Sequence, residues 1–264
     1  MIGSVNGIGV VAVGTGDRMP DRAAFFTEDP LAVAAQVALS DADTRHAHVL
    51  RLGVGERVGL RDGIGTVASG LVVRLARTQA LVEIDHVRHV EPPAPIHLMV
   101  PIADRDRMLW LAEKAAELNV ASWRPVLWQR SRSVSPRGDG PAFRSKVRVR
   151  MIAALVQSRS AWLPYLYPDA NVERAIAAAP SGTRLVLDAA GVAASSVRLE
   201  PLVTLAVGPE GGFEPEELQA LGAAGFISLA LGDSVLRFET AAVAGVAVAR
   251  SMLTTSTVTH PTHS

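Results

Sequence analysis

The chain has 264 residues, with 26 basic and 26 acidic side chains and a formal net charge of zero. Its 48% hydrophobic content can form a buried core, which excludes a disordered protein, and the neutral balance argues against nonspecific coating of nucleic acid. Cysteine is absent and the seven histidines show no ligand spacing, so we expect no disulfide and no metal site. Since no apolar run approaches the roughly 18 to 20 residues that span a bilayer, we expect a cytoplasmic protein without a membrane anchor.

The first third of the chain predicts a leader followed by a small β-barrel. Residues 1–22 lack the basic region and cleavage site of a secretory signal and predict a poorly ordered leader. Residues 23–90 contain short apolar or alternating runs separated by turn signals, which is typical of a barrel. One short helix is expected from Asp41 to Leu50, with Ser40 or Asp41 as its N-cap. Residues 91–95 hold three prolines and predict a stiff linker.

From residue 96 the pattern changes to alternating strands and helices. The expected helices begin near Asp104, Lys146, Pro215 and Thr240, and a loop is expected from Ser131 to Pro141. The expected strands cover residues 96–100, 120–128, 185–187, 202–207 and 227–231, with Pro125 placing the second at an edge or making it irregular. This alternation predicts an α/β domain over residues 96–255, with a ligand crevice at the carboxyl ends of its strands and a tail at 256–264.

One segment of this neutral chain is strongly basic. Residues 122–160 contain nine basic side chains and a single acid, Asp139. The basic residues are Arg124, Arg130, Arg132, Arg137, Arg144, Lys146, Arg148, Arg150 and Arg159. A local excess of this kind favours contact with a polyanion such as RNA, and a solvated helix face with a basic loop is the alternative.

Two glycine loops follow apolar strands near the C-terminus. The first, Gly208-Pro209-Glu210-Gly211-Gly212, runs into a helix that opens with Pro215 and acidic residues. It lacks the spacing of a phosphate-binding or dinucleotide-binding loop, and its acids would repel phosphate but tolerate a cationic sulfonium. The second, from Leu231 to Arg237, enters a final helix rich in small residues, which suits close packing or a subunit interface. Taken singly, the first loop could equally be an ordinary strand-to-helix turn, and the alternative for the second is that it leads into a plain buried terminal helix.

Together the two motifs resemble the RsmE family. The pattern is Gly-Pro-Glu-Gly-Gly-Phe at residues 208–213, followed by Leu-Gly-x-x-Val-Leu-Arg-x-Glu-Thr-Ala at residues 231–241. Supporting similarity lies in Asp106-Arg107-Met108, in the stretch from Pro125 to Ser133, and in Gln157-Ser158-Arg159. The resemblance extends from about residue 24 to residue 253. Members of this family are SPOUT-class methyltransferases that use S-adenosylmethionine to modify N3 of a uridine in 16S ribosomal RNA.

The resemblance implies an N-terminal PUA-like barrel that helps to hold RNA, a catalytic domain with a deep trefoil knot, and a homodimer that acts on 16S rRNA or the small ribosomal subunit. It also implies which residues hold the cofactor. These are Leu187, Val207, Gly208, Pro209, Glu210, Gly211, Gly212, Leu231, Gly232, Val235, Leu236 and Arg237. Arg130, Arg132 and Arg159 are expected to hold RNA phosphates.

Uridine N3 is a poor nucleophile until its proton leaves, so a carboxylate that takes the proton or a cation that stabilises the anion would help. Arg107, Arg237 and Glu239 are the catalytic candidates, with Glu210 beside them. The alternative for Arg237 and Glu239 is a structural ion pair at the helix start.

Several residues depart from the family pattern on the RNA side. Asp104 stands where a basic residue is usual, Asn119 replaces a glycine, Ser160 stands where a second arginine is common, and Phe238 replaces a threonine. The paired histidines of the first helix reduce to His46 and His48. Two rivals therefore stay open, which are a SPOUT enzyme with a different rRNA target and a non-catalytic RNA-binding or ribosome-assembly protein.

Overall fold

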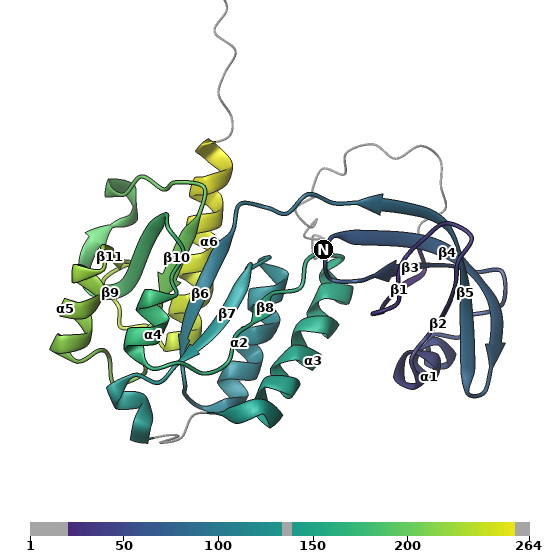
Figure 1. Cartoon of the computed structure of the whole chain (residues 1–264), viewed down its shortest axis with the longest axis horizontal. Helices are drawn as coiled ribbons and strands as arrows, with labels where there is room; N and C mark the ends of the chain where they lie inside the picture. The colour runs from purple at the N-terminus through teal and green to yellow at the C-terminus, as the bar shows by residue number, and fades with distance from the viewer. Residues whose placement is uncertain (1–20, 134–138, 257–264) are drawn as a thin grey trace, which may run out of the picture.

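The chain forms two lobes, each built on its own β-sheet (Figure 1). The computed structural model describes residues 21–133 and 139–256. The N-terminal sheet has the order β1-β3-β4-β5-β2, and the C-terminal sheet has the order β11-β9-β10-β6-β7-β8. The elements of the first lobe are β1 (Ala23–Phe26), β2 (Gln36–Ala38), α1 (Asp41–Val49), β3 (Arg57–Arg61), β4 (Thr66–Ala76) and β5 (Gln79–His89).

The elements of the second lobe follow in chain order. They are β6 (Ile96–Pro101), α2 (Arg105–Glu117), β7 (Ser122–Val126), the 3₁₀ helix η1 (Gln129–Ser133), α3 (Gly140–Ser158), β8 (Tyr165–Leu166), α4 (Val172–Ala177), β9 (Thr183–Ala193), the 3₁₀ helix η2 (Ala194–Ser196), β10 (Val203–Ala206), α5 (Pro215–Ala223), β11 (Phe226–Ala230) and α6 (Phe238–Ser256).

The N-terminal sheet is antiparallel except where β1 runs parallel to β3. Alternate residues of β3, β4 and β5 point into one apolar core, which includes Leu60, Val72 and Ile84. Helix α1 begins as expected, because the side chain of Ser40 accepts a hydrogen bond from the backbone N–H of Asp43 (3.1 Å).

All six strands of the C-terminal sheet are parallel, and helices cover both faces. Neighbouring residues of β6 enter different cores, because side chains alternate along a strand. Leu98 packs with α2, α3 and α6 on one face, whereas Met99 packs with α4 and α5 on the other. The predicted α/β layering is confirmed, and the parallel order places the carboxyl ends of β6, β9 and β10 at the same edge.

Several element boundaries differ from the predicted ones. Helix α3 begins at Gly140, six residues before the expected start, so part of the predicted loop is helical. Pro141 suits this position because the first helical turn does not need its missing N–H. Helix α6 likewise begins at Phe238 instead of Thr240. Pro125 lies in β7 one strand from the edge, where the short β8 pairs only with Ser122 and Trp123.

Only the last two residues of the predicted leader are described, since residues 1–20 lie outside the described residues. Asp21 and Arg22 are described, and the backbone N–H of Arg22 donates to the carbonyl of Arg57 (3.0 Å), extending the pairing of β1 with β3. Most of the predicted tail, residues 257–264, also lies outside them.

Hydrogen bonds connect the lobes just after the end of α3, and we call the residues that form them the joint. The backbone N–H of Gly65 donates to Ala161 (3.0 Å), and the indole Nε1 of Trp162 donates to the carbonyl of Val90 (3.0 Å). A Cβ atom at Gly65 would lie 2.4 Å from the Trp162 ring, and Gly65 has φ of +101°, so both space and backbone conformation favour glycine there. The joint therefore holds α3 close to the N-terminal sheet.

Gly191 allows β9 and β11 to approach each other at a register shift between Ser228 and Leu229. A Cβ atom at Gly191 would lie 2.4 Å from the carbonyl carbon of Ser228, which is backbone and cannot move aside alone. We predict that Gly191→Ala lowers the free energy of unfolding by about 1 to 3 kcal/mol. Chemical denaturation of the full chain measures this value.

Gly222 provides the matched control for that substitution, because it lies within α5 and a Cβ atom there would have no atom from outside its own stretch of helix within 4 Å. Gly222→Ala should raise the free energy of unfolding by about 0.5 to 1 kcal/mol, since alanine restricts the unfolded chain and favours helix. Equal effects of the two substitutions would contradict the close approach at Gly191.

Candidate active site

The first glycine loop leaves the sheet at the carboxyl end of β10. The backbone N–H of Val207 still donates to Met99 of β6 (3.0 Å), and a tight turn follows in which the N–H of Gly212 donates to Pro209 (2.8 Å). Gly212 has φ of +78°, a conformation that glycine adopts without strain. A Cβ atom at Gly208 would lie 2.8 Å from the ring of Phe213, so this ring packs directly on the loop backbone.

Arg130 of η1 clamps this loop from the side. Its Nε donates to the Glu214 carboxylate (2.9 Å), and its Nη1 donates to the carbonyl of Gly211. A Cβ atom at Gly211 would lie 2.9 Å from Cδ of Arg130, which explains the glycine. Arg130, predicted to hold an RNA phosphate, therefore lies on the glycine loop with its guanidinium engaged by protein acceptors.

Glu217 joins the same two segments from beneath. Its side chain is buried, with the residue 8% exposed, and Oε1 accepts a hydrogen bond from the backbone N–H of Gln129 (2.7 Å). Oε2 accepts from the N–H of Glu214 (2.9 Å), completing a capping box at the start of α5. The sequence interpretation treated Glu217 only as a first-turn acid. The three-residue spacing of Glu214 and Glu217 could have predicted this cap. Nothing in the sequence could have predicted the hydrogen bond between Glu217 and Gln129.

The catalytic candidates lie in two groups. Arg107 of α2 forms an ion pair with Glu210 of the glycine loop, and its Nε lies 4.0 Å from Oε1 of Glu239 at the start of α6. Arg107, Glu210 and Glu239 therefore meet, although they are far apart in the chain. The side chain of Glu239 is 12% exposed, and its Oε2 has no hydrogen-bond partner among the described residues.

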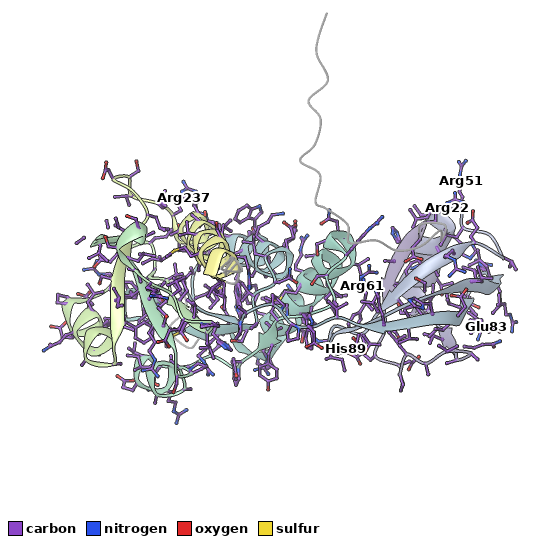
Figure 2. The ribbon with its side chains drawn as sticks, turned by 90° about the horizontal axis from the view of Figure 1, so that it is seen from above. Arg22, Arg51, Arg61, Glu83, His89 and Arg237 are labelled. Carbon is purple, nitrogen blue, oxygen red and sulfur yellow. The ribbon has the colours of Figure 1, made fainter. Side chains whose placement is uncertain are left out.

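Arg237 lies apart from this group. Its side chain is exposed, and Figure 2 shows it beside the start of α6, pointing outward. The alternative in which Arg237 and Glu239 form an ion pair at the helix start is wrong, since among the described residues Glu239 pairs with Arg107 and not with Arg237. Arg107 was a separate candidate, and the sequence contained no sign of its pairing.

The second glycine loop presents apolar side chains to solvent. Val235 is 94% exposed and Leu236 is also exposed, while Gly232 has φ of +146°. Leu187 of β9 and Leu231 pack against the core at its rim. Strand β9 lies between β10 and β11 in the sheet. Leu187 therefore lies in a strand that neighbours β10, the strand from which the first glycine loop leaves. Exposed apolar side chains beside an acidic group suit a ligand with both apolar and cationic parts.

Of the two other predicted RNA-binding arginines, Arg159 does not join the glycine loops. Arg159 ends α3 in a left-handed conformation, with φ of 58°, and lines a cleft against the N-terminal sheet. The side chain of Arg132 lies outside the described residues. Within residues 21–133 and 139–256, no cluster of three or more metal-ligating side chains occurs, and no helix is long and apolar enough to cross a membrane.

The amino-acid sequence matches known families of proteins. Residues 90–250 match the family described as RNA methyltransferase domain, and residues 39–85 match the one described as RNA methyltransferase PUA domain. The chain is 31% identical over 243 residues to Ribosomal RNA small subunit methyltransferase E of Mycobacterium bovis, covering 83% of this chain and 88% of the relative. The Mycobacterium tuberculosis protein of the same name gives the same values.

Two solved structures share the fold over nearly their whole length. Ribosomal RNA small subunit methyltransferase E of Neisseria gonorrhoeae, bound to S-adenosylmethionine, has a TM-score of 0.79 at 29% identity, covering 87% of this chain and 97% of that one. A methyltransferase of Legionella pneumophila in complex with S-adenosylmethionine has a TM-score of 0.78 at 27% identity, covering 86% and 96%.

The buried carboxylate of Glu217 provides a test of how the glycine loop is held. Glu217→Gln keeps one acceptor oxygen but places an NH₂ group against a backbone N–H, so we expect the free energy of unfolding to fall by about 1 to 3 kcal/mol. Urea denaturation measures this change. The control is Glu216→Gln, because Glu216 is exposed in the same helical turn. If the two variants were equally stable, Glu217 would not hold the loop.

Proposed function

The chain belongs to the RsmE family of RNA methyltransferases, and we propose that it uses S-adenosylmethionine to methylate N3 of a uridine in the 16S rRNA of the small ribosomal subunit. The observation that carries the proposal is the meeting of Arg107, Glu210 and Glu239 beside the two glycine loops. The match to small-subunit methyltransferases supports the substrate class. Its site of action would be the cytoplasm, where the ribosome is.

The residues of both loops fit S-adenosylmethionine, which supplies an electrophilic methyl group on a cationic sulfonium. Gly208 and Gly211 lack a Cβ atom, so Phe213 and Arg130 pack directly against the loop and would hold its backbone groups in place for the cofactor. Leu187, Leu231, Val235 and Leu236 offer apolar contact to an adenine ring. The other proposed contacts, in the same loops, are Val207, Pro209, Glu210, Gly212, Gly232 and Arg237.

Glu239 is our candidate for the group that takes the N3 proton. Its Oε2 is buried and has no hydrogen-bond partner in the described chain, so it can accept a proton from a base placed beside it. The neighbouring Arg107 cation would stabilise negative charge on the deprotonated uracil. Arg237, exposed and beside the same helix start, would contact RNA or cofactor from outside.

We further propose the domain organisation and assembly that the family implies. Residues 23–90 form the PUA-like barrel, residues 91–95 the linker and residues 96–255 the SPOUT domain, with a trefoil-knotted path through β9, β10 and β11. The exposed apolar residues Val235 and Leu236 support contact with a second copy of the chain in a homodimer. Arg130 would act by positioning the glycine loop, and Arg159, with Arg132, by holding RNA.

The decisive test of the substrate is the modification pattern of rRNA from a strain that lacks this gene. We expect N3-methyluridine alone to disappear from 16S rRNA and to return when the gene is restored, as measured by mass spectrometry of nucleosides. Loss of a different methylated nucleoside would instead show another rRNA target. Calorimetry of the purified protein with S-adenosylmethionine tests the enzyme itself, because a chain that bound none would be a non-catalytic RNA-binding protein.

Substitution of Glu239 tests the proton acceptor. Glu239→Gln keeps the size of the side chain but removes its basicity, so kcat should fall by about 10² to 10⁴-fold. The affinity for S-adenosylmethionine, measured by calorimetry, should change little. Glu173→Gln, in an exposed position on α4, serves as the control and should keep full turnover. Wild-type turnover in Glu239→Gln would rule out this carboxylate as the base.

A further inference from the structure

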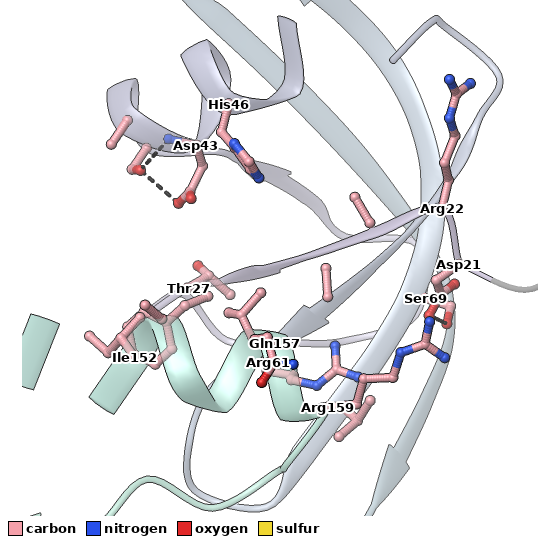
Figure 3. A pocket seen from close by; sticks show the side chains of 18 of the residues that line it. Asp21, Arg22, Thr27, Asp43, His46, Arg61, Ser69, Ile152, Gln157 and Arg159 are labelled. Carbon is pink, nitrogen blue, oxygen red and sulfur yellow. Dashed lines mark hydrogen bonds between the residues drawn. The ribbon is translucent and has the colours of Figure 1, made fainter. Parts of the chain in front are cut away.

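A cleft lies between the lobes, away from the glycine loops. Its volume is about 1960 Å³, larger than the roughly 300 to 1,000 Å³ of a small-molecule pocket. One wall comes from β1, β3 and α1, and the other comes from the last turns of α3 (Figure 3). Figure 3 shows Arg61 and Arg159 on the side nearest α3, with Asp43 and His46 of α1 across the opening. The cleft is therefore large and lined by charged side chains.

Arg61 is the unusual residue of this cleft. It is 5% exposed at the end of β3, and its Nε and Nη1 have no hydrogen-bond partner within the part of the chain that the structure describes. A buried cation normally has a partner, because removing its hydration costs free energy that only an acceptor can offset. Arg61 thus presents unused donors inside a cavity.

The charged neighbours of Arg61 make the surroundings of its guanidinium more positive. Burial lowers the pKa of the Arg61 guanidinium, Asp21 raises it, and the nearby Arg159 and Arg88 lower it further. Asp21 makes no ion pair with Arg61 among the described residues, and its carboxylate accepts a hydrogen bond from Ser69 (3.2 Å). Arginines gathered around one point with a single acid nearby favour the binding of a negatively charged group.

Three other charged residues of the cleft are already paired. Arg22 forms an ion pair with Glu56, Arg57 donates to Asp85 (2.8 Å), and Glu28 accepts from Arg148 (2.6 Å). These pairs are exposed or partly exposed and need no ligand. The cleft arginines for which the described residues provide no ion pair are therefore Arg61, Arg88 and Arg159.

We propose that Arg61 and Arg159 form a phosphate-binding site in the cleft between the lobes. The phosphate can come from an RNA strand or from a free phosphate compound, and the RNA source rests on the function proposed above. Arg61 lies in the N-terminal sheet and Arg159 ends α3, so the bound group contacts both lobes. The hydrogen bonds of Gly65 with Ala161 and of Trp162 with Val90 join the two lobes close to the segments that carry these arginines.

Thermal unfolding of the full chain in inorganic phosphate or in chloride, at matched ionic strength, tests the site directly. Phosphate should raise the Tm of the wild type by several degrees, since a ligand that binds only the folded state stabilises it. Arg61→Met should lose this response and, without phosphate, be at least as stable as the wild type. Arg77→Gln, in the exposed turn between β4 and β5, should respond like the wild type.

The outcome of Arg61→Met also separates a ligand site from a structural role. A structural arginine would make the variant less stable by the same amount in both salts, and that result would overturn the proposal. An identical phosphate response in wild type and Arg61→Met would overturn it as well. Arg159→Gln is the second variant and removes the arginine that the C-terminal lobe contributes. It should reduce the increase in Tm that phosphate produces.

Binding of a single-stranded RNA oligonucleotide, followed by fluorescence anisotropy, distinguishes the two sources. If RNA supplies the phosphate, Arg61→Met should weaken binding several-fold and reduce the salt slope by about 0.7, the value for one phosphate contact. Unchanged RNA affinity with a phosphate response that depends on Arg61 would support the site and assign it to a free phosphate compound. Calorimetry with S-adenosylmethionine on the same samples reports separately on the proposed enzyme function.

Discussion

The buried carboxylate of Glu217 is the interaction on which the candidate active site depends. A carboxylate inside a protein is stable only when hydrogen bonds replace its hydration, and Glu217 receives them from two backbone segments, at Gln129 and Glu214. It therefore fixes the 3₁₀ helix after β7 against the first glycine loop, and Arg130 adds a clamp from outside. The loop can consist largely of glycine and still have one conformation, because its surroundings restrain it.

Local signals predicted much of this structure, and long-range pairing explains what they missed. The apolar strands, the cap at Ser40 and both glycine loops could be predicted because each depends on residues that are neighbours in the chain. The contacts of Arg107 with Glu210 and of Arg130 with Gly211 join segments 103 and 81 residues apart, so no local pattern contains them. The early start of α3 was missed because glycine and proline around residue 141 indicate a loop as readily as a first helical turn.

The basic segment illustrates how a charge excess in sequence differs from a charged surface. Several of its arginines have partners within the protein, including Arg130 with Glu214 and Arg148 with Glu28. Arg124 lies over the ring of Tyr167, 3.7 Å from its centroid. Such partners reduce the charge available to an external polyanion, so a count of basic residues overstates the RNA-binding surface. What distinguishes Arg159 is its place in a cleft beside Arg61, an arginine that is buried.

Helix α3 relates the two proposed sites to each other. Its first residues lie near the glycine-loop end, because Asp139 contacts Arg105 at 3.6 Å and Arg107, one half-turn further along α2, reaches Glu210. Its last residue leads to Arg159 in the cleft between the lobes. A helix of 19 residues is about 28 Å long, so a ligand that occupied both sites would have to be extended over that distance. A nucleic acid strand meets this requirement, whereas a free phosphate compound would fill the cleft alone, and on this ground the geometry favours RNA as the source of the phosphate.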